Sequence, residues 1–174
     1  MFRKNVVGLG VSALLVVGCA GLAWSDSPDT WITTKAKITL LTTDGVSATG
    51  VNVDTVDGKV TIHGKVNTAD EKTKAEAAVR KLDGVKDVQN LLQVVPEEKR
   101  KVVSASDDVI KDSVQNALKA NAAVEGVKVA SVNKGVVLLS GETKTLDAKL
   151  KAIEVALAQP GVARVATEIQ TPEK

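Results

Sequence analysis

The feature that most constrains this chain of 174 residues is an internal repeat. Residues 56–66 read VDGKVTIHGKV, and residues 133–143 read NKGVVLLSGET. The same offset in residue number aligns further identities, as far as Val88 and Val165. The repeated residues are glycines, valines and helix-capping residues, which fix a backbone but carry no chemistry. The sequence therefore predicts two copies of one small domain, and it favours binding or architecture over catalysis.

The N-terminus has the layout of an export signal. Arg3 and Lys4 precede an apolar stretch over residues 5–18, which is shorter than the roughly 20 apolar residues that a membrane span needs. A basic region followed by a short apolar stretch is typical of a secretory signal peptide. We therefore assign residues 1–18 to a signal peptide and residues 19–28 to a tether, and we expect export to the periplasm.

Cys19 is the only cysteine, so it cannot form an internal disulfide. The residues VVGC at 16–19 resemble the lipobox of bacterial lipoproteins, which implies cleavage before Cys19 and acylation of its side chain. By resemblance to enterobacterial sorting, Ala20 indicates an anchor in the outer membrane. The alternative is cleavage after Ser25, with small residues at Ala23 and Ser25, which would leave a soluble secreted protein. The lipoprotein interpretation is favoured.

The charge of the mature chain argues against a nucleic-acid partner. Loss of residues 1–18 removes Arg3 and Lys4 but no acidic residue, which leaves 21 basic and 21 acidic residues. A neutral chain lacks the basic excess of nucleic-acid-binding proteins. The only aromatic residues are Phe2, Trp24 and Trp31, so platforms for base stacking are missing.

Residues 29–95 form the first predicted domain. Asp29 or Thr30 caps a helix that runs to about Leu41. The period of the apolar residues then changes from 3.6 to 2, and Asp57-Gly58 is a strong signal for a hairpin turn. Gly84 supplies a helix stop, and Pro96 ends the unit. The remaining predicted elements are strands over 51–55 and 60–64, a helix over 69–82 and a strand over 86–95.

Residues 106–171 form the second predicted domain, after a linker over residues 96–105. The linker is expected to be a solvated connector, because Lys99-Arg100-Lys101 adjoins two glutamates. Ser106 or Asp107 is expected to cap a helix that runs to about Asn121. The other predicted elements are strands over 127–132 and 136–142, a helix over 146–159 and a strand over 163–170. The residues expected to face inward on the helix over 146–159 are Leu146, Leu150, Ile153 and Leu157.

Each unit thus has the order αββαβ. The hairpin strands are antiparallel, and the strand–helix–strand segment is long enough for a crossover, so each sheet is expected to be mixed. We predict an α+β fold class with two tandem domains. Each domain has a three-stranded mixed sheet covered on one face by two helices.

Four segments of the first unit resemble the BON domain: DTWITTK at 29–35, VNVDTVDG at 51–58, VTIHG at 60–64 and GVKDVQN at 84–90. The second unit matches at 127–135, 136–141 and 161–165, but it lacks the opening tryptophan, and Thr167 replaces the asparagine. The resemblance covers nearly all of residues 29–171. It implies similarity to the dual-BON proteins of Gram-negative bacteria, some of which are soluble periplasmic stress proteins and others outer-membrane lipoproteins. The family implies phospholipid binding without enzymatic activity.

The residues themselves provide no strong candidate for chemistry. His63 is the only histidine, and strand alternation turns it away from the inward Val60 and Ile62, so we expect it at the surface. A metal site needs several convergent ligands, and a Ser-His-Asp triad needs three convergent groups. We therefore expect no enzymatic activity, no metal and no cofactor.

The candidate lipid contacts lie on the outward side of the first helix of the second domain and at the start of the first domain: Lys111, Gln115, Lys119 and Trp31. Each lysine near an anionic leaflet contributes about 1 kcal/mol, so two lysines would act mainly beside an acyl anchor. That the lysines are only solvated is slightly favoured, because Asp108 and Asp112 share their helix. For Trp31, packing against Ile38 and the sheet is favoured over a lipid contact.

The predicted function is that of a non-enzymatic envelope protein. It would bind phospholipids, including anionic ones, or other envelope components, and it would support the integrity of the outer membrane. The alternative is a soluble periplasmic stress protein with chaperone-like binding of unfolded polypeptide. A third and weaker hypothesis is a structural adaptor between envelope proteins.

Overall fold

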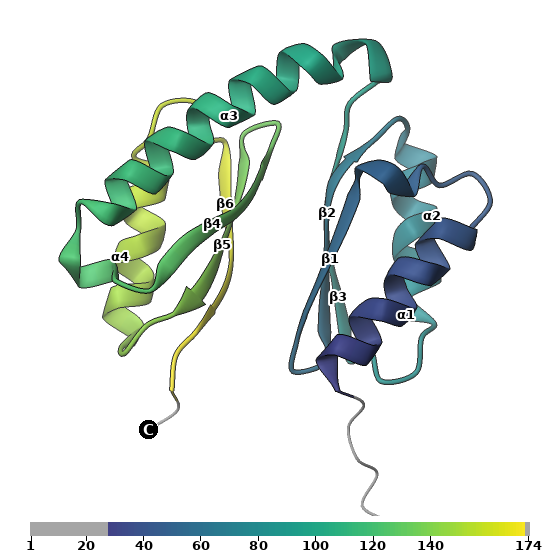
Figure 1. Ribbon diagram of the computed structural model, residues 1–174, viewed down its shortest axis with the longest axis horizontal. Coiled ribbons are helices and arrows are strands. Elements are labelled where there is room, and N and C mark those ends of the chain that lie inside the picture. Colours follow the sequence, from purple (N-terminus) through teal and green to yellow (C-terminus); the bar gives the residue numbers. More distant parts are fainter. Residues whose placement is uncertain (1–27, 173–174) are drawn as a thin grey trace, which may run out of the picture.

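The computed structural model describes residues 28–172. The predictions of a signal peptide, of acylation at Cys19 and of the tether up to residue 27 lie outside the described residues. The first unit consists of α1 (Asp29–Thr42), η1 (Ala48–Gly50), β1 (Val51–Val56), β2 (Lys59–Val66), α2 (Ala69–Arg80) and β3 (Asp87–Val94) (Figure 1). The second consists of α3 (Glu97–Lys119), η2 (Ala122–Val124), β4 (Val127–Asn133), β5 (Val136–Glu142), α4 (Leu146–Leu157) and β6 (Arg164–Gln170).

Each unit contains one three-stranded mixed sheet. The order is β1-β2-β3 in the first sheet and β4-β5-β6 in the second. The hairpin pairs β1–β2 and β4–β5 are antiparallel, whereas β2–β3 and β5–β6 are parallel and are joined through a crossover helix. The predicted fold class of two tandem αββαβ domains is confirmed.

The two hairpin turns are held in the same way. Both central residues have positive φ, 53° and 78° at Asp57-Gly58 and 50° and 74° at Lys134-Gly135, as a type I′ turn requires. The Asp29 carboxylate accepts hydrogen bonds from the backbone N–H groups of Asp57 and Gly58, at 2.8 and 2.9 Å. The Asp107 carboxylate accepts the equivalent pair from the second turn, at 3.0 and 3.1 Å. In each domain one aspartate therefore ties a helix to the hairpin.

Two of the repeated glycines are explained by close backbone approach. Gly64 has φ of 130°, and a Cβ placed on it would overlap the carbonyl oxygen of Gly50. Gly141 repeats this geometry with φ of 122° and the carbonyl oxygen of Gly126. A side chain is excluded at both positions, so the repeat records a shared backbone.

The helix α1 buries Ile32, Ala36 and Leu40 against the first sheet. The favoured packing of Trp31 against the sheet is wrong, because this side chain is 54% exposed and points away from the core. Ile38 is also exposed, at 56%. The buried side chains and the exposed ones both recur along α1 with a helical spacing. The sequence pattern alone therefore does not show which face of the helix packs on the sheet.

The helix α4 also buries a different face from the predicted one. Ala152 and Ala156 are fully buried, and they pack in a core cluster with residues of the second sheet such as Val137, Leu139 and Ile169. The expectation that the leucines of this helix face inward is wrong. The side chains that are instead more than half exposed are Leu146, Leu150 and Leu157. The small alanine side chains let the helix lie close to the sheet.

The helix α3 begins at Glu97 and continues for 23 residues to Lys119. The predicted helix start at Ser106 or Asp107 is therefore wrong, and most of segment 96–105 is helical. Pro96 precedes the helix, and Glu97 and Glu98 occupy its first turn, where acidic side chains favour the positive end of the helix dipole. Among residues 28–172, no helix is both long enough and apolar enough to cross a membrane.

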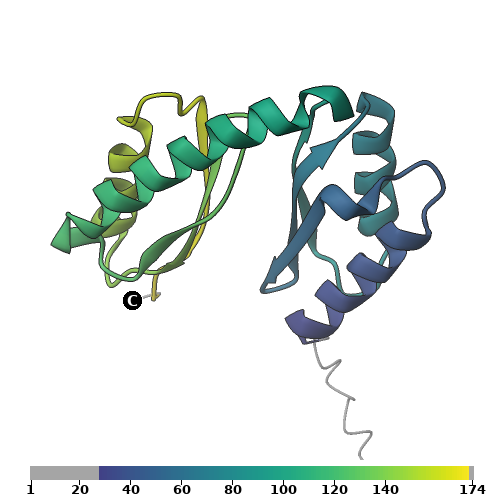
Figure 2. The same cartoon turned by 45° about the horizontal axis from the view of Figure 1, so that its top comes forward.

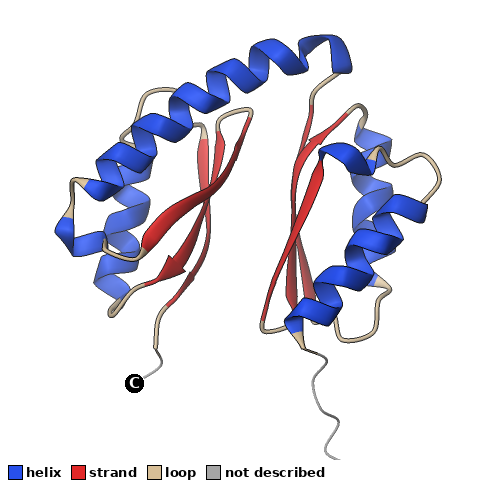
Figure 3. Ribbon diagram, in the orientation of Figure 1, coloured by secondary structure: helices blue, strands red, loops and turns tan. Residues whose placement is uncertain are grey.

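The two sheets turn their uncovered faces toward each other, and the helices cover the outer sides (Figure 3). The helix α3 extends from the top of the first domain to the outer side of the second (Figure 2). A small apolar cluster of Leu91, Leu138 and Ala166, with Ala130 against it, joins the two sheets. The rest of this sheet-to-sheet face is largely polar.

Candidate functional site

An ion pair connects the two domains at one end of the face between the sheets. The Lys65 ammonium on β2 lies 2.8 Å from the Asp107 carboxylate on α3, and these side chains are only 14% and 4% exposed. Lys65 also donates a hydrogen bond to the Ser104 hydroxyl, at 3.0 Å. On the same helix, Arg100 donates to the side-chain oxygen of Asn67, at 3.1 Å. These contacts bind the first turns of α3 to the first domain.

His63 lies within the face between the sheets. Its side chain points away from Val60 and Ile62, as alternation predicts, but the residue is only 5% exposed. The expected surface position is therefore wrong, since sequence alternation does not reveal that a second sheet covers this face. The ring Nε2 lies 2.9 Å from a carboxylate oxygen of Asp54. Because a carboxylate only accepts, Nε2 carries the shared hydrogen.

Two carboxyl groups of this face have shifted pKa values. The hydrogen bond from His63 lowers the pKa of Asp54 and outweighs the opposing effect of partial burial. Burial raises the pKa of Glu168 on β6, and the nearby Thr61 hydroxyl acts in the opposite direction. Because Thr61, Asp54 and His63 of the first domain act on Glu168 of the second, the pKa of Glu168 depends on the docking of the two sheets.

The face between the sheets contains a cleft and buried polar atoms that lack hydrogen-bond partners. A cleft of about 430 Å³ is lined by Lys59, Thr61 and Gln89 from the first domain and by residues 167–171 from the second. Four buried polar atoms have no hydrogen-bond partner within residues 28–172: Thr61 Oγ1, His63 Nδ1, Gln89 Oε1 and Glu168 Oε1. Buried polar atoms of this kind are commonly satisfied by water, so the cleft is consistent with a hydrated contact between domains.

The structure does not bring the predicted lipid contacts together. Lys111 and Lys119 are exposed on α3. Gln115 is engaged instead, because its side-chain oxygen accepts a hydrogen bond from the backbone N–H of Val129 on β4, at 3.2 Å. Trp31 belongs to the other domain, on α1, where the Lys35 ammonium lies 5.5 Å from the centre of its ring, a cation–π contact.

Large apolar side chains are exposed on the outer helices of both domains. On α1 they are Trp31, Ile38 and Leu41, and on α4 they are Leu146, Leu150 and Leu157. Sequence periodicity assigns the α4 residues to the core, so their exposure is visible only in the structure. In the described part of the chain, His, Cys, Asp and Glu form no group of three that could hold a metal ion.

The fold and these surfaces define a protein of two tandem α+β domains that are docked sheet to sheet and present their helices outward. The BON domain model matches residues 28–96 and 106–173. The chain therefore belongs to the BON-domain family.

Comparisons with individual proteins are more limited. The chain is 38% identical over 65 residues to osmotically-inducible protein Y of Escherichia coli (strain K12). The match covers 37% of this chain and 32% of that protein, so it spans about a third of the relative.

Two solved structures concern CdsD, a structural protein of the type III secretion system of Chlamydia trachomatis. The first is 16% identical with a TM-score of 0.32, over 79% of this chain and 59% of that one. The second, of the C-terminal domain, is 15% identical with a TM-score of 0.33, over 84% and 66%. Similarities of this size carry no argument about function.

Proposed function

We propose that this protein is a non-enzymatic envelope protein that binds phospholipids or other envelope components and supports the integrity of the outer membrane. An acylated Cys19 would hold it at the outer membrane, on the periplasmic side. The two domains would act as one docked body that presents one of its outer helical sides to a surface.

The observation that carries this proposal is the exposure of large apolar side chains that neither core uses. Trp31 and Leu41 on α1 are 54% and 68% exposed, and three leucines on α4 are more than half exposed. Gathered apolar side chains on a surface are typical of protein or membrane interaction sites. The exposed Lys111 and Lys119 and the partly exposed Lys35 add charge that favours an anionic surface.

Vesicle flotation tests the proposal. The chain without residues 1–18 and with Cys19→Ser has no acyl anchor, so any flotation reports binding by the domains and the tether. We expect this chain to float with vesicles of phosphatidylcholine and phosphatidylglycerol at low salt. Absence of flotation at every lipid concentration would count against lipid binding by the folded domains. Mass spectrometry of the mature N-terminus tests the anchor separately, since an N-terminal Asp26 would exclude it.

The second candidate function is chaperone-like binding of unfolded polypeptide in the periplasm. The exposed apolar side chains fit such a partner as well, and the name of the Escherichia coli relative refers to osmotic induction. Suppression of the thermal aggregation of a reporter protein, without flotation on vesicles, would favour this function over the first.

A further inference from the structure

The outer face of α4 carries a regular apolar stripe. Leu146, Leu150 and Leu157 are 61%, 55% and 51% exposed, and Ile153 lies between them. Their spacing of four, three and four residues places them along one side of a helix. From the first to the last residue, the stripe spans roughly 16 Å at 1.5 Å per residue. We call these four residues the α4 leucine stripe.

The first domain shows that the fold does not require this stripe. The repeat aligns α2 with α4, and the buried Ala75 and Val79 of α2 correspond to the buried Ala152 and Ala156 of α4. The positions that correspond to the α4 leucine stripe are Ala69, Thr73, Glu76 and Arg80.

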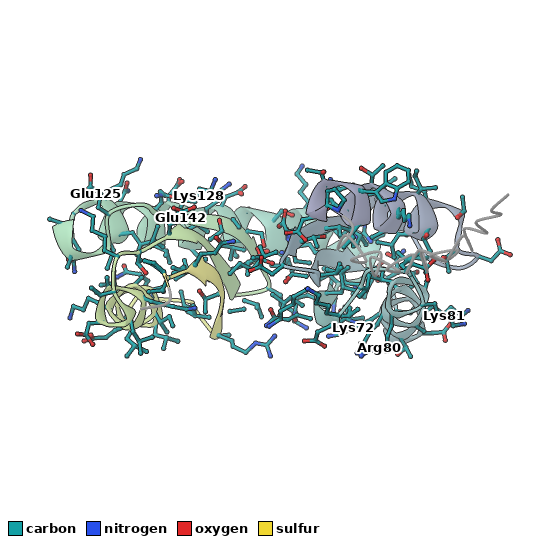
Figure 4. The ribbon with its side chains drawn as sticks, turned by 90° about the horizontal axis from the view of Figure 1, so that it is seen from below. Lys72, Arg80, Lys81, Glu125, Lys128 and Glu142 are labelled. Atoms are coloured by element: carbon teal, nitrogen blue, oxygen red, sulfur yellow. The ribbon has the colours of Figure 1, made fainter. Side chains whose placement is uncertain are left out.

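Three of these four α2 residues are polar, and two of the three are paired with each other. Arg80 donates a hydrogen bond to Glu76 at 2.8 Å, and in Figure 4 Arg80 lies at the outer rim of the first domain. The two domains therefore share a core arrangement, but this face of the crossover helix is apolar only in the second domain. A property that differs between two copies of one scaffold points to a role outside folding.

We propose that the α4 leucine stripe inserts at the boundary between the headgroups and acyl chains of a phospholipid surface. This inference rests on the proposed function and names the element that makes the contact. It assigns the main apolar contact to α4 rather than to the lysines of α3 or to Trp31 of α1.

The size of the stripe argues for lipid over a second copy of the chain. Three leucines that are about half exposed offer on the order of 300 Å², the lower end of the largest apolar patches on monomers. A stable dimer buries about 800 Å² on each partner. An amphipathic helix that lies in a membrane interface needs no such area when a second signal already holds the protein there.

The position of the chain ends also supports a lipid surface as the partner of the α4 leucine stripe. Lys144 and Thr145, just before α4, and Ala148 in its first turn line a cleft together with residues 170–172 at the end of the described chain. In Figure 1 this end of the chain and the entry into α1 lie at the same end of the molecule. Cys19 precedes Pro28 by nine residues, and the root-mean-square length of a flexible chain of nine residues is roughly 17 Å. An anchor at Cys19 would keep the first turn of α4 near the bilayer.

The test compares two matched variants of the unanchored chain, without residues 1–18 and with Cys19→Ser. The α4 variant carries Leu146→Ala, Leu150→Thr and Leu157→Gln, which imitate the polar face of α2. The control carries Val102→Thr and Val109→Thr on α3, where the side chains are 72% and 70% exposed, more than any of the three leucines. Partition to phosphatidylcholine vesicles, with and without phosphatidylglycerol, is measured by flotation at 0.05 and 0.5 M salt.

We expect the α4 variant to lose at least tenfold in partition coefficient and the control less than twofold. The loss should persist at 0.5 M salt, because an apolar contact is not screened, whereas a contact through lysines would be. Equal partition of the α4 variant and the parent chain would overturn the inference and leave the proposed function intact. A parent chain that does not float at all would overturn both.

Two further measurements keep the result decisive. Circular dichroism and urea unfolding must show that the α4 variant is folded; if it is not, the single substitution Leu150→Thr takes its place, with an expected loss of about threefold. Sedimentation of the parent chain tests the competing occupant. A dimer that becomes monomeric in the α4 variant would assign the stripe to a second copy and overturn the lipid assignment.

Discussion

Replacing Asp107 by alanine removes three interactions in one step. Its carboxylate accepts two backbone hydrogen bonds from the turn at Lys134 and Gly135 and faces the Lys65 ammonium at 2.8 Å. Because Asp107 is only 4% exposed and Lys65 only 14%, the substitution leaves a poorly solvated ammonium with the Ser104 hydroxyl as a remaining partner. Breaking a buried pair on one side costs about 3–5 kcal/mol, so we expect Asp107→Ala to lower the free energy of unfolding by that amount.

The first domain provides an internal comparison. Asp29 accepts the same two hydrogen bonds from the turn at Asp57 and Gly58, but that site is partly open to water. The turn N–H groups can be solvated once the carboxylate is gone, so Asp29→Ala should cost only about 1–2 kcal/mol. The difference in the free energy of unfolding between the two variants measures the effect of the burial of Asp107 and of its pairing with Lys65.

A double-mutant cycle completes the test. Lys65→Met removes the ammonium that Asp107→Ala leaves unpaired, so the double variant should be more stable than Asp107→Ala alone by about 1–3 kcal/mol. Urea unfolding of each variant, followed by far-ultraviolet circular dichroism, gives the free energies. The reasoning is refuted if Asp107→Ala costs no more than Asp29→Ala and the second substitution recovers nothing.

Further predictions concern folding and pH. Because the raised pKa of Glu168 makes the folded state bind more protons than the unfolded one just above the ordinary value of 4.5, stability should fall as pH rises through this window. Urea midpoints at several pH values should show this slope in the parent chain and not in Glu168→Gln. Asp54 acts in the opposite sense, since its lowered pKa supports stability that is lost as pH falls below 3.8. Gly64→Ala should cost at least about 3 kcal/mol through overlap with the carbonyl oxygen of Gly50. A loss below about 1 kcal/mol in the same assay would show that the backbone at Gly50 moves aside. Ala105→Pro should cost about 3 kcal/mol because it interrupts α3, whereas a flexible linker would tolerate it.

The sequence alone predicts the order and topology of the elements because their signals are local. The turn at Asp57-Gly58 needs positive φ, and Gly64 and Gly141 mark a close backbone approach that both copies share. A repeat that preserves such positions preserves the backbone, even where the side chains around it differ. The α+β class and the αββαβ order follow from these positions.

The faces of the helices are harder to predict, because two stripes with helical period compete on one helix. On α4 the leucines are the more hydrophobic stripe, but the sheet receives Ala152 and Ala156. The choice depends on how closely the helix can approach the sheet, which is a tertiary property. The same holds for α1, where Ala36 faces the core and Ile38 does not.

The contact between domains has no local signal. His63 alternates correctly along its strand, and only the docking of the second sheet makes it buried. The basic run after Pro96 has the composition of a solvated linker, yet Arg100 and Ser104 face the first domain from a continuous helix. Residues that make contacts between domains are recognised only when the relative position of the two domains is known.

The account depends most directly on what the outer face of α4 touches. A bimane label on a cysteine placed at residue 150, in the chain with Cys19→Ser, reports this contact when vesicles carry nitroxide-labelled lipids. We predict strong quenching at residue 150 by a nitroxide near the top of the acyl chains, together with weak quenching of the same label at residue 73, the corresponding position on α2. Equal and weak quenching at both positions, with the label at residue 150 still open to iodide in water, would contradict the account.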